Sequence, residues 1–201
     1  MKRKHIFVAL TGASGSMYGL RLLEQLCLSE AQVTFSTSRS GTIVCREETG
    51  LDLSGDITKA LQRLYDHLEV DGDIRMVHPD DLFCGAASGS SAPDALVICP
   101  CSMGTLARIA GGSSGNLIER SADVMLKERR PLLLVPRETP LSDIHLENML
   151  KLSRAGARII PAMPAFYGRP QSVLDLVDFV VGKIMDQLGI DNDLYKRWGT
   201  E

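Results

Sequence analysis

Three basic side chains in the second half of the chain have the type and spacing to bind a phosphate group. Arg120 and Lys127 lie seven residues apart in a predicted helix, so both project from one helix face. Arg137 directly follows the apolar run LLLVP, which places it at the sheet edge where ligands bind. A salt-bridged surface is the alternative for the helical pair, but cations converging with Arg137 would suit a dianionic phosphate. Glu138 is expected either to orient Arg137 or to contact a partner chain.

Two turns rich in glycine and hydroxyl groups follow apolar runs and precede helical patterns. They are TGASGS at residues 11–16 and CSMGT at residues 101–105. Gly12 and Gly15 permit a tight first turn, and unpaired N–H groups at the start of the following helix attract an anion. The first turn lacks the G-x-G-x-x-G pattern of ordinary dinucleotide sites. Each turn therefore fits either a helix cap or a phosphate-binding turn.

Three features outside these turns also bear on chemistry. Glu48 ends a predicted helix, where the helix dipole disfavours an acid, so another group is expected to hold its carboxylate; a solvated glutamate is the alternative. The segment PAMPAFYGRP (161–170) is either a packed connector or a dry wall beside a reacting apolar group, with the Tyr167 hydroxyl available to a phosphate. Trp198, the single tryptophan, either packs on a neighbouring surface or covers a ligand.

Other common catalytic patterns are absent from the sequence. Cys99 and Cys101 form a C-x-C pair, but no second close pair follows, so buried cysteines are favoured over a metal site and no metal is expected. The histidines share no motif spacing, and the chain has no Ser-His-Asp pattern, HExxH motif or P-loop.

Apolar runs alternate with helical patterns along the chain. Predicted strands cover residues 5–10, 32–37, 74–78, 95–100, 131–136 and 157–161, and predicted helices cover residues 15–29, 39–49, 57–68, 103–111, 116–129, 142–155 and 171–189. This order predicts an α/β protein with a parallel, doubly wound sheet between two helix layers. The small-residue segment 80–93 is the main irregular loop and a candidate to form part of a site. We expect residues 1–201 to form one domain, because neither a repeat nor a linker interrupts them.

Composition excludes several classes of function. The chain has 201 residues, 44% hydrophobic and 23% charged, with a net charge of −3. This acidic balance argues against a surface for nucleic acid or for an anionic membrane. No apolar run approaches the ~20 residues needed to span a bilayer. Five cysteines without framework spacing indicate the reducing cytoplasm.

Together these stretches resemble the UbiX-type flavin prenyltransferases across nearly the whole chain. The most specific pieces are TGASG with YGLRLL, ASGSSAP with CPCSMGTL, and NLIERSADVMLKERRPLLLVPRETPLSDIHLENM. PAFYGRPQS, DLVDFVV and the final RWG complete the match. The thirty-residue block around KERRPL is too long to recur by chance.

The resemblance implies a Rossmann-like, flavoprotein-type subunit of a large homo-oligomer, typically a dodecamer. It also implies bound FMN, dimethylallyl phosphate as co-substrate and no metal. The family joins the prenyl group to N5 and C6 of reduced FMN, and the prenylated FMN serves a UbiD-type decarboxylase. The sequence leaves open the receiving decarboxylase, the pathway (ubiquinone biosynthesis or breakdown of aromatic acids) and acceptance of the diphosphate donor.

The resemblance also assigns roles to individual positions. The flavin contacts are Gly12, Ala13, Ser14, Ser38, Ser102, Met103, Gly104, Thr105 and Arg137. The positions that hold the prenyl phosphate or complete its pocket are Arg120, Lys127, Arg137, Glu138, Tyr167 and Lys183. Ser14 and Glu48 match a polar pair near flavin N5 implicated in proton handling, and with Tyr167 they form the expected catalytic set. Trp198 matches a tail aromatic that closes over the site. Position 183 is commonly Arg in relatives, and Lys keeps the charge but loses the planar fork.

Two other functions compete with prenyl transfer. A flavin-dependent cysteine decarboxylase would need a catalytic histidine, for which His78 is the one candidate. A non-catalytic flavin carrier would need only one phosphate site, whereas the additional basic residues indicate a second.

Overall fold

The sheet of this protein is fully parallel. A computed structural model describes residues 3–199 and contains six strands in the order β3-β2-β1-β4-β5-β6. The strands are β1 (His5–Leu10), β2 (Gln32–Thr37), β3 (Asp73–Met76), β4 (Ala95–Cys101), β5 (Leu132–Pro136) and β6 (Arg158–Ile159). Every adjacent pair runs parallel, and the winding direction reverses between β1 and β4. Such a reversal is where open α/β sheets bind ligands.

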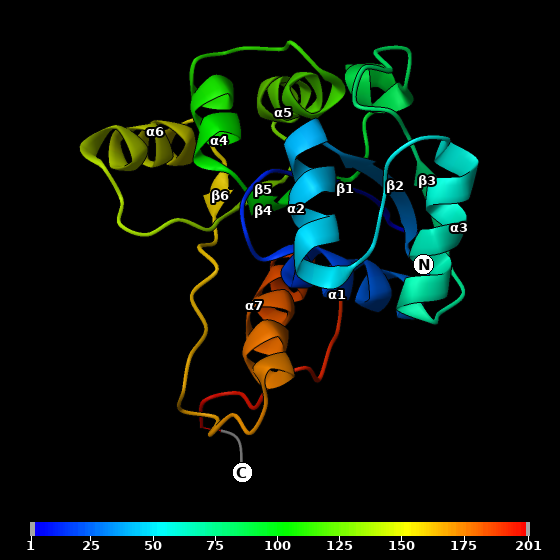
Figure 1. The fold of residues 1–201 in the computed structure, drawn as a ribbon. Coiled ribbons are helices and arrows are strands. Elements are labelled where there is room, and N and C mark those ends of the chain that lie inside the picture. The colour runs from blue at the N-terminus through cyan, green and yellow to red at the C-terminus, as the bar shows by residue number, and fades with distance from the viewer. Residues whose placement is uncertain (1–2, 200–201) are drawn as a thin grey trace.

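Helices cover both faces of the sheet, which confirms the predicted doubly wound α/β fold (Figure 1). The helices are α1 (Ser16–Leu28), α2 (Arg39–Thr49), α3 (Ile57–Leu68), α4 (Met103–Ala110), α5 (Leu117–Lys127), α6 (Asp143–Arg154) and α7 (Val173–Leu188). One core contains residues of α1, α2, α3 and α7, and the other contains residues of α4, α5 and α6. Strand β1 serves both, because alternate side chains point to opposite faces: Ile6 and Val8 enter the first core and Phe7 enters the second.

Each predicted strand and helix is present, with ends that differ by a few residues. The last strand, predicted over 157–161, is observed as the two-residue β6, which pairs only with β5. The irregular segment 80–93 contains two short 3-10 helices, η1 (Gly85–Ala87) and η2 (Gly89–Ser91). Single turns of this length carry no detectable hydrophobic period, so the sequence pattern does not reveal them.

Most helices that follow the strands begin with a side-chain cap. The Ser38 hydroxyl accepts the N–H of Gly41 at the start of α2, and the Ser102 hydroxyl accepts that of Thr105 at the start of α4. Helix α1 differs, because it follows Gly15, which has no side chain to accept its first N–H groups. Within residues 3–199, no helix combines the length and apolar character needed to cross a membrane.

Candidate functional site

The turns after β1, β2 and β4 are joined by hydrogen bonds at the carboxyl edge of the sheet. The Ser38 N–H donates to the Leu10 carbonyl at 2.9 Å. The Thr11 hydroxyl accepts the Ser102 N–H at 2.8 Å and donates to the Pro100 carbonyl at 2.9 Å. Residues predicted to contact a flavin from three separate turns therefore share one continuous surface.

Two glycines are required in the first turn for steric reasons. A Cβ atom on Gly12 would lie 2.4 Å from the Ser40 Cβ, so the turn approaches the start of α2 more closely than any side chain permits. Gly15 has a φ of 109°, which side chains rarely adopt. Ala13, between them, is buried. The turn thus presents backbone rather than bulky side chains at the sheet edge.

Glu48 is held by the uncapped start of α1. Its carboxylate accepts the Gly15 N–H at 3.0 Å and the Ser16 N–H at 2.8 Å. The expectation that another group holds this acid is therefore confirmed. The positive end of the α1 dipole stabilises the carboxylate and offsets the unfavourable negative end of α2. Burial alone raises the pKa of Glu48, but the Ser14 hydroxyl and the N–H groups of Ser16 and Gly15 outweigh it and lower the pKa. The carboxylate is consequently ionised at neutral pH.

Arg137 reaches across the same turn from the end of β5. Its Nε donates to the Ser14 carbonyl at 2.9 Å, and its aliphatic stem lies close to Gly15. Arg137 thus lies at the carboxyl edge of the sheet, as predicted. Glu138 is exposed, and its carboxylate accepts the N–H of Thr139 at 3.1 Å. Since no hydrogen bond within residues 3–199 joins Glu138 to Arg137, the expectation that it orients this guanidinium is not met.

The turn after β4 is supported by an ion pair between Arg108, which is half exposed, and the buried Glu119; sequence analysis did not identify this pair. Ser102 Oγ donates to Thr105 Oγ1 at 3.0 Å, and Arg108 Nη2 donates to the same oxygen at 3.2 Å. Arg108 Nε also donates to Glu119, which is 3% exposed. Met103 and Gly104 form the first turn of α4 above this pair. The sequence did contain one signal for the role of Glu119. Asn116 precedes it by three residues, which is the spacing of a helix-capping pair.

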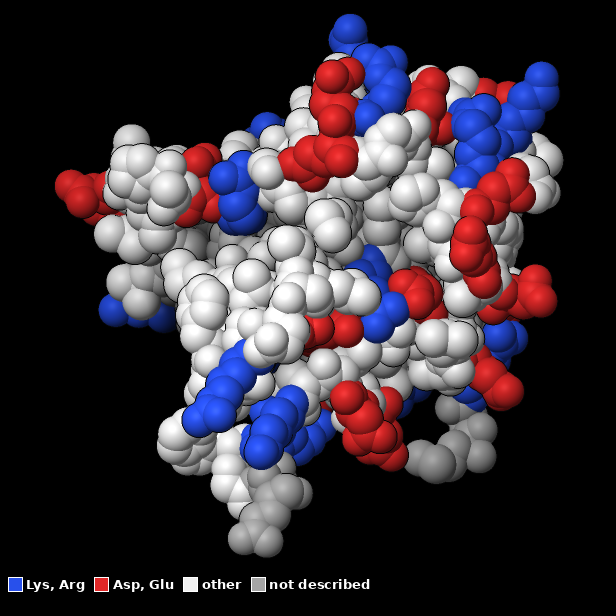
Figure 2. All heavy atoms as spheres, turned by 60° about the horizontal axis from the view of Figure 1, so that its bottom comes forward, with Lys and Arg blue, Asp and Glu red and all other residues white. Residues whose placement is uncertain are grey.

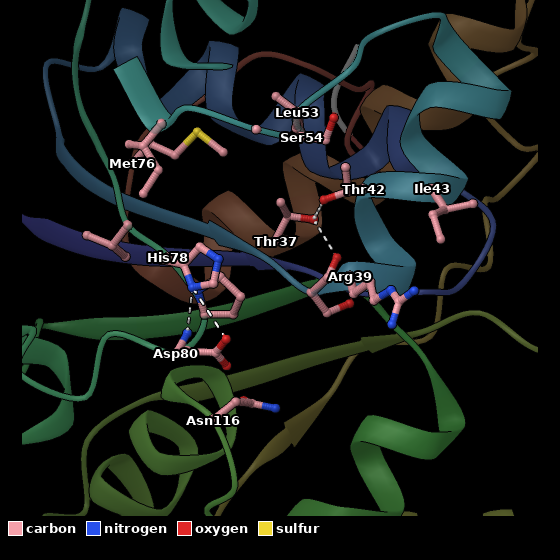
Figure 3. A pocket seen from close by; sticks show the side chains of 15 residues that line it. Thr37, Arg39, Thr42, Ile43, Leu53, Ser54, Met76, His78, Asp80 and Asn116 are labelled. Atoms are coloured by element: carbon pink, nitrogen blue, oxygen red, sulfur yellow. Dashed lines mark hydrogen bonds and ion pairs between the residues drawn. The ribbon is translucent and has the colours of Figure 1, made fainter. Parts of the chain in front are cut away.

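A hollow of about 660 Å³ opens beside Ser38, at the carboxyl ends of β2 and β3 (Figure 3). Thr37 and Thr42 lie on one side, and His78 and Asp80 lie on the other. The His78 Nδ1 atom accepts the Asp80 N–H at 3.2 Å. The hollow extends the surface of the three turns away from Arg137.

Arg120 and Lys127 of α5 have local partners, and Lys127 lies far from Arg137 within one chain. Arg120 donates to the Ala87 carbonyl at 3.1 Å and pairs with Asp123 at 2.8 Å, and Lys127 pairs with Glu128. Lys127 ends α5 just before β5 begins, whereas Arg137 follows the end of β5. The five residues of that strand span roughly 17 Å. The predicted convergence of Lys127 with Arg137 is therefore wrong for a single chain, because α5 runs antiparallel to β5 and carries Lys127 to the opposite edge.

Three other predicted site residues meet near the C-terminus. The Tyr167 ring packs edge-on against Trp198, with centroids 5.3 Å apart, and against Phe179 at 5.8 Å. The Lys183 ammonium lies 5.5 Å from the Phe179 centroid. Trp198 is 81% exposed.

The segment 161–170 is neither a packed connector nor a dry wall in the single chain. Met163 is 64% exposed and Phe166 is 69% exposed. Basic side chains gather around this end of the molecule, where Arg169, Lys196 and Arg197 line a hollow with Tyr167 and Trp198 (Figure 2). The surface thus combines exposed apolar rings with positive charge.

No group of His, Cys, Asp or Glu side chains within the described part of the chain has the arrangement of a metal site.

Comparison with known proteins agrees with this geometry. The family model described as Flavoprotein matches residues 1–185. Flavin prenyltransferase UbiX of Pseudomonas aeruginosa is 53% identical over 200 residues, covering 98% of this chain and 95% of that protein. The crystal structure of AnUbiX (PadA1) in complex with FMN and dimethylallyl pyrophosphate superposes with a TM-score of 0.88 at 38% identity, covering 100% of both chains.

Two further solved structures are similar to this chain to different degrees. A dodecameric FMN-dependent UbiX-like decarboxylase from Escherichia coli O157:H7 has a TM-score of 0.85 at 38% identity, covering 98% of this chain and 100% of that one. The cysteine decarboxylase TvaF shares only the fold, at 18% identity and a TM-score of 0.53, with 78% of this chain and 88% of that chain covered. The sequence and the structure therefore agree that this chain belongs to the UbiX-type flavin prenyltransferases.

Proposed function

We propose that this protein transfers a dimethylallyl group from dimethylallyl phosphate to N5 and C6 of reduced FMN. The observation that carries the proposal is that the chain has two distinct sets of polar groups. The strand-end turns hold an ionised carboxylate and Arg137 at one edge, and Lys183 and Tyr167 form a separate basic and aromatic cluster. Binding of FMN alone would require only the first set.

The residues at the sheet edge fit FMN. Because Gly12 has no side chain, the turn after β1 packs closely on α2 and exposes its backbone; we call this surface the cradle. Its border is formed by Ser14, Ser38, Ser102 and Arg137. Ala13, Met103, Gly104 and Thr105 complete the set that would hold the flavin. When bound, reduced FMN supplies the electron-rich ring that accepts the prenyl group.

Glu48 and Ser14 are suited to handle a proton rather than to bind phosphate. The Glu48 carboxylate is ionised, so it can accept the proton that leaves C6 and would repel an anionic phosphate. The neighbouring Ser14 hydroxyl can donate or accept a hydrogen bond in either protonation state.

The basic groups are suited to stabilise the departing phosphate. When the allylic C–O bond breaks, the bonding electrons stay with the phosphate oxygen, and fixed cations stabilise that charge. Lys183 and the Tyr167 hydroxyl would supply part of this site, and Arg120 and Lys127 would supply the rest from another copy of the chain. Glu138, exposed beside Arg137, would complete the pocket wall, and Trp198 would cover it and exclude water.

Assembly into a homo-oligomer, which we propose to be a dodecamer, follows from two features of the surface. Lys127 and Arg137 lie at opposite edges of one chain, and Met163, Phe166 and Trp198 are exposed apolar groups that a second copy would bury. The dodecameric relative supports this assembly.

All five cysteines are free and buried, which suits a reducing cytoplasm. We further propose that the prenylated FMN passes to a UbiD-type decarboxylase, as the family assignment implies.

The test is anaerobic incubation of the protein with reduced FMN and dimethylallyl phosphate, followed by mass spectrometry of the extracted flavin. We expect a gain of one isoprenyl unit that requires both the protein and the donor. Parallel reactions with dimethylallyl diphosphate show whether the diphosphate is also accepted. Flavin that binds but keeps its mass with both donors would refute prenyl transfer and favour a carrier.

A further inference from the structure

We propose that Tyr195 is a positioning residue that holds the Lys183 ammonium in place for the prenyl phosphate. The inference rests on the proposed role of Lys183. It concerns a tail residue, Tyr195, that neither the sequence motifs nor the strand-end turns single out.

The Lys183 ammonium lies over the face of the Tyr195 ring. Its Nζ is 4.6 Å from the centroid of this ring and 5.5 Å from that of Phe179. Both distances are within the range in which an aromatic face attracts a cation. Lysine has a flexible four-carbon stem and no planar fork, so neighbouring groups must determine where its charge resides. Two rings perform this task here, and Tyr195 is the nearer one.

The Tyr195 ring is itself fixed from two directions. It packs on the bare backbone of Gly182, where an added Cβ atom would come within 2.4 Å of Tyr195 Cδ1. It also meets Phe179 edge-on, with centroids 5.2 Å apart. The glycine directly before Lys183 thus gives the ring its position against α7, and no larger residue could replace it without displacing the ring.

Asp186 anchors the ring through its hydroxyl. The Tyr195 hydroxyl donates to Asp186 Oδ2 at 2.6 Å. Asp186 follows Lys183 by three residues in α7, which is nearly one helical turn. The same carboxylate accepts Arg197 Nη2 at 2.8 Å and Asn192 Nδ2 at 3.0 Å. Burial raises the pKa of Asp186, but these hydrogen bonds outweigh it and lower the pKa, so the carboxylate is ionised and accepts the hydrogen bond that the Tyr195 hydroxyl donates.

This arrangement links Lys183 to the other proposed site residues of the tail. Tyr195 contacts Phe179, Phe179 contacts Tyr167, and Tyr167 contacts Trp198, each with rings edge to face. Tyr195 therefore stands at one end of an aromatic row that also contains Tyr167 and Trp198. Loss of the ring would free the ammonium without removing its charge.

The decisive experiment is a double-mutant cycle on the assembled, FMN-loaded protein with Tyr195→Leu and Lys183→Met. We expect Tyr195→Leu to raise the KM for dimethylallyl phosphate about fivefold, within the range of a partly exposed cation–π contact, and to change kcat less than twofold. Tyr195→Phe keeps the ring but loses the hydroxyl bond to Asp186, so its KM should lie between those of the wild type and Tyr195→Leu. In the Lys183→Met background, Tyr195→Leu should cause no further rise in KM, because its effect acts through the ammonium.

Tyr65→Leu is the matched control. Tyr65 is also a tyrosine that joins a helix to a neighbouring segment, with its hydroxyl donating to the Gly72 carbonyl at 2.8 Å and accepting the Ile74 N–H at 2.9 Å. Its loss should lower the unfolding temperature and leave the KM unchanged. An unaltered KM in Tyr195→Leu, or an equal rise in KM with and without Lys183, would overturn the proposal.

Calorimetric binding of dimethylallyl phosphate to the oxidised holoprotein separates this inference from the proposed function. If the wild type binds the donor but does not transfer the prenyl group, the proposed reaction is wrong, and weaker binding by Tyr195→Leu still supports the positioning role. If the wild type does not bind the donor, the phosphate site and the positioning role are both refuted. Equal binding by both proteins refutes the positioning role alone.

Discussion

At the scale of single residues, the clearest result is the partner of Glu48. A glutamate at the end of α2 would face the negative end of its own helix, but the first N–H groups of α1 donate hydrogen bonds to the Glu48 carboxylate. The absence of a side chain at Gly15 leaves those N–H groups available. One missing cap therefore creates a site for an ionised carboxylate.

Replacement of Glu48 by Gln should affect both stability and turnover. We expect a loss of about 0.5 kcal/mol in the free energy of unfolding at pH 7, typical of an anion at a helix N-terminus. Prenyl transfer should slow by about 10²-fold or more while FMN remains bound, because the amide cannot accept a proton. Single-turnover kinetics and denaturant titration measure the two effects. Wild-type turnover in both Glu48→Gln and Ser14→Ala would remove the pair from the mechanism.

The stability difference between wild type and Glu48→Gln should depend on pH. The pKa of Glu48 is lower in the folded state than its ordinary value of 4.5, so its contribution is complete above pH 4.5 and declines as the pH falls through the folded pKa. Denaturant titrations from pH 7 down to pH 3 should show the two proteins approaching each other at the acid end. A constant difference over this range would contradict the assignment.

At the scale of elements, the contact between the β1–α1 turn and α2 shapes the surface that we propose to hold the flavin. Gly12 permits that contact, and the hydrogen bond from the Ser38 N–H to the Leu10 carbonyl fixes the start of α2 beside the end of β1. Because these are backbone contacts, a small shift of either element would alter several of the proposed flavin contacts at once.

Gly12→Ala should therefore impair FMN binding. The added methyl group must displace the start of α2, and such overpacking costs about 1–3 kcal/mol, so the dissociation constant for FMN should rise about tenfold. Fluorescence titration with FMN measures it. Gly111→Ala adds the same group at the end of α4, where the nearest atoms lie at 3.4 Å, and should bind FMN normally. Equal affinities for the two variants would show that the Gly12 contact does not shape the site.

At the scale of the whole molecule, the basic residues divide between two edges of the sheet. Arg137 lies at the carboxyl edge with the cradle, and Lys127 lies at the end of α5 that precedes β5. A phosphate site that uses both must therefore combine different copies of the chain.

Mixed oligomers test this division. Lys127→Ala and Arg137→Ala should each lose most prenyl transfer when assembled alone, but co-expression should restore part of the activity. In a mixed assembly some sites receive an intact Arg137 from one copy and an intact Lys127 from another. Activity of purified mixed oligomers, compared with each parent at equal FMN loading, measures the recovery. A mixture no more active than its parents would place both residues of each site in one chain.

The fold and the sheet edge that carries the candidate site could both be predicted from the sequence. Short apolar runs such as LLLVP are nearly continuous because helices cover both faces of their strands, and this local pattern predicted the strands, the helices and their parallel order. The same reasoning placed Arg137 and the small-residue turns at the carboxyl edge, since parallel strands end together there. Residue-by-residue resemblance supplied the family, which the comparisons then confirmed.

Contacts between groups that are far apart in the sequence could not be predicted in this way, because they depend on how the elements pack. Glu48 and Gly15 are 33 positions apart, and their contact depends on how α2 crosses the start of α1. Lys183 and Tyr195 meet because the chain reverses after Gly189 and packs back on Gly182. Lys127 and Arg137 are close in sequence yet lie at opposite edges, because β5 separates them. Hydrophobic periodicity describes the surroundings of one segment, whereas these contacts arise from the packing of several segments in three dimensions.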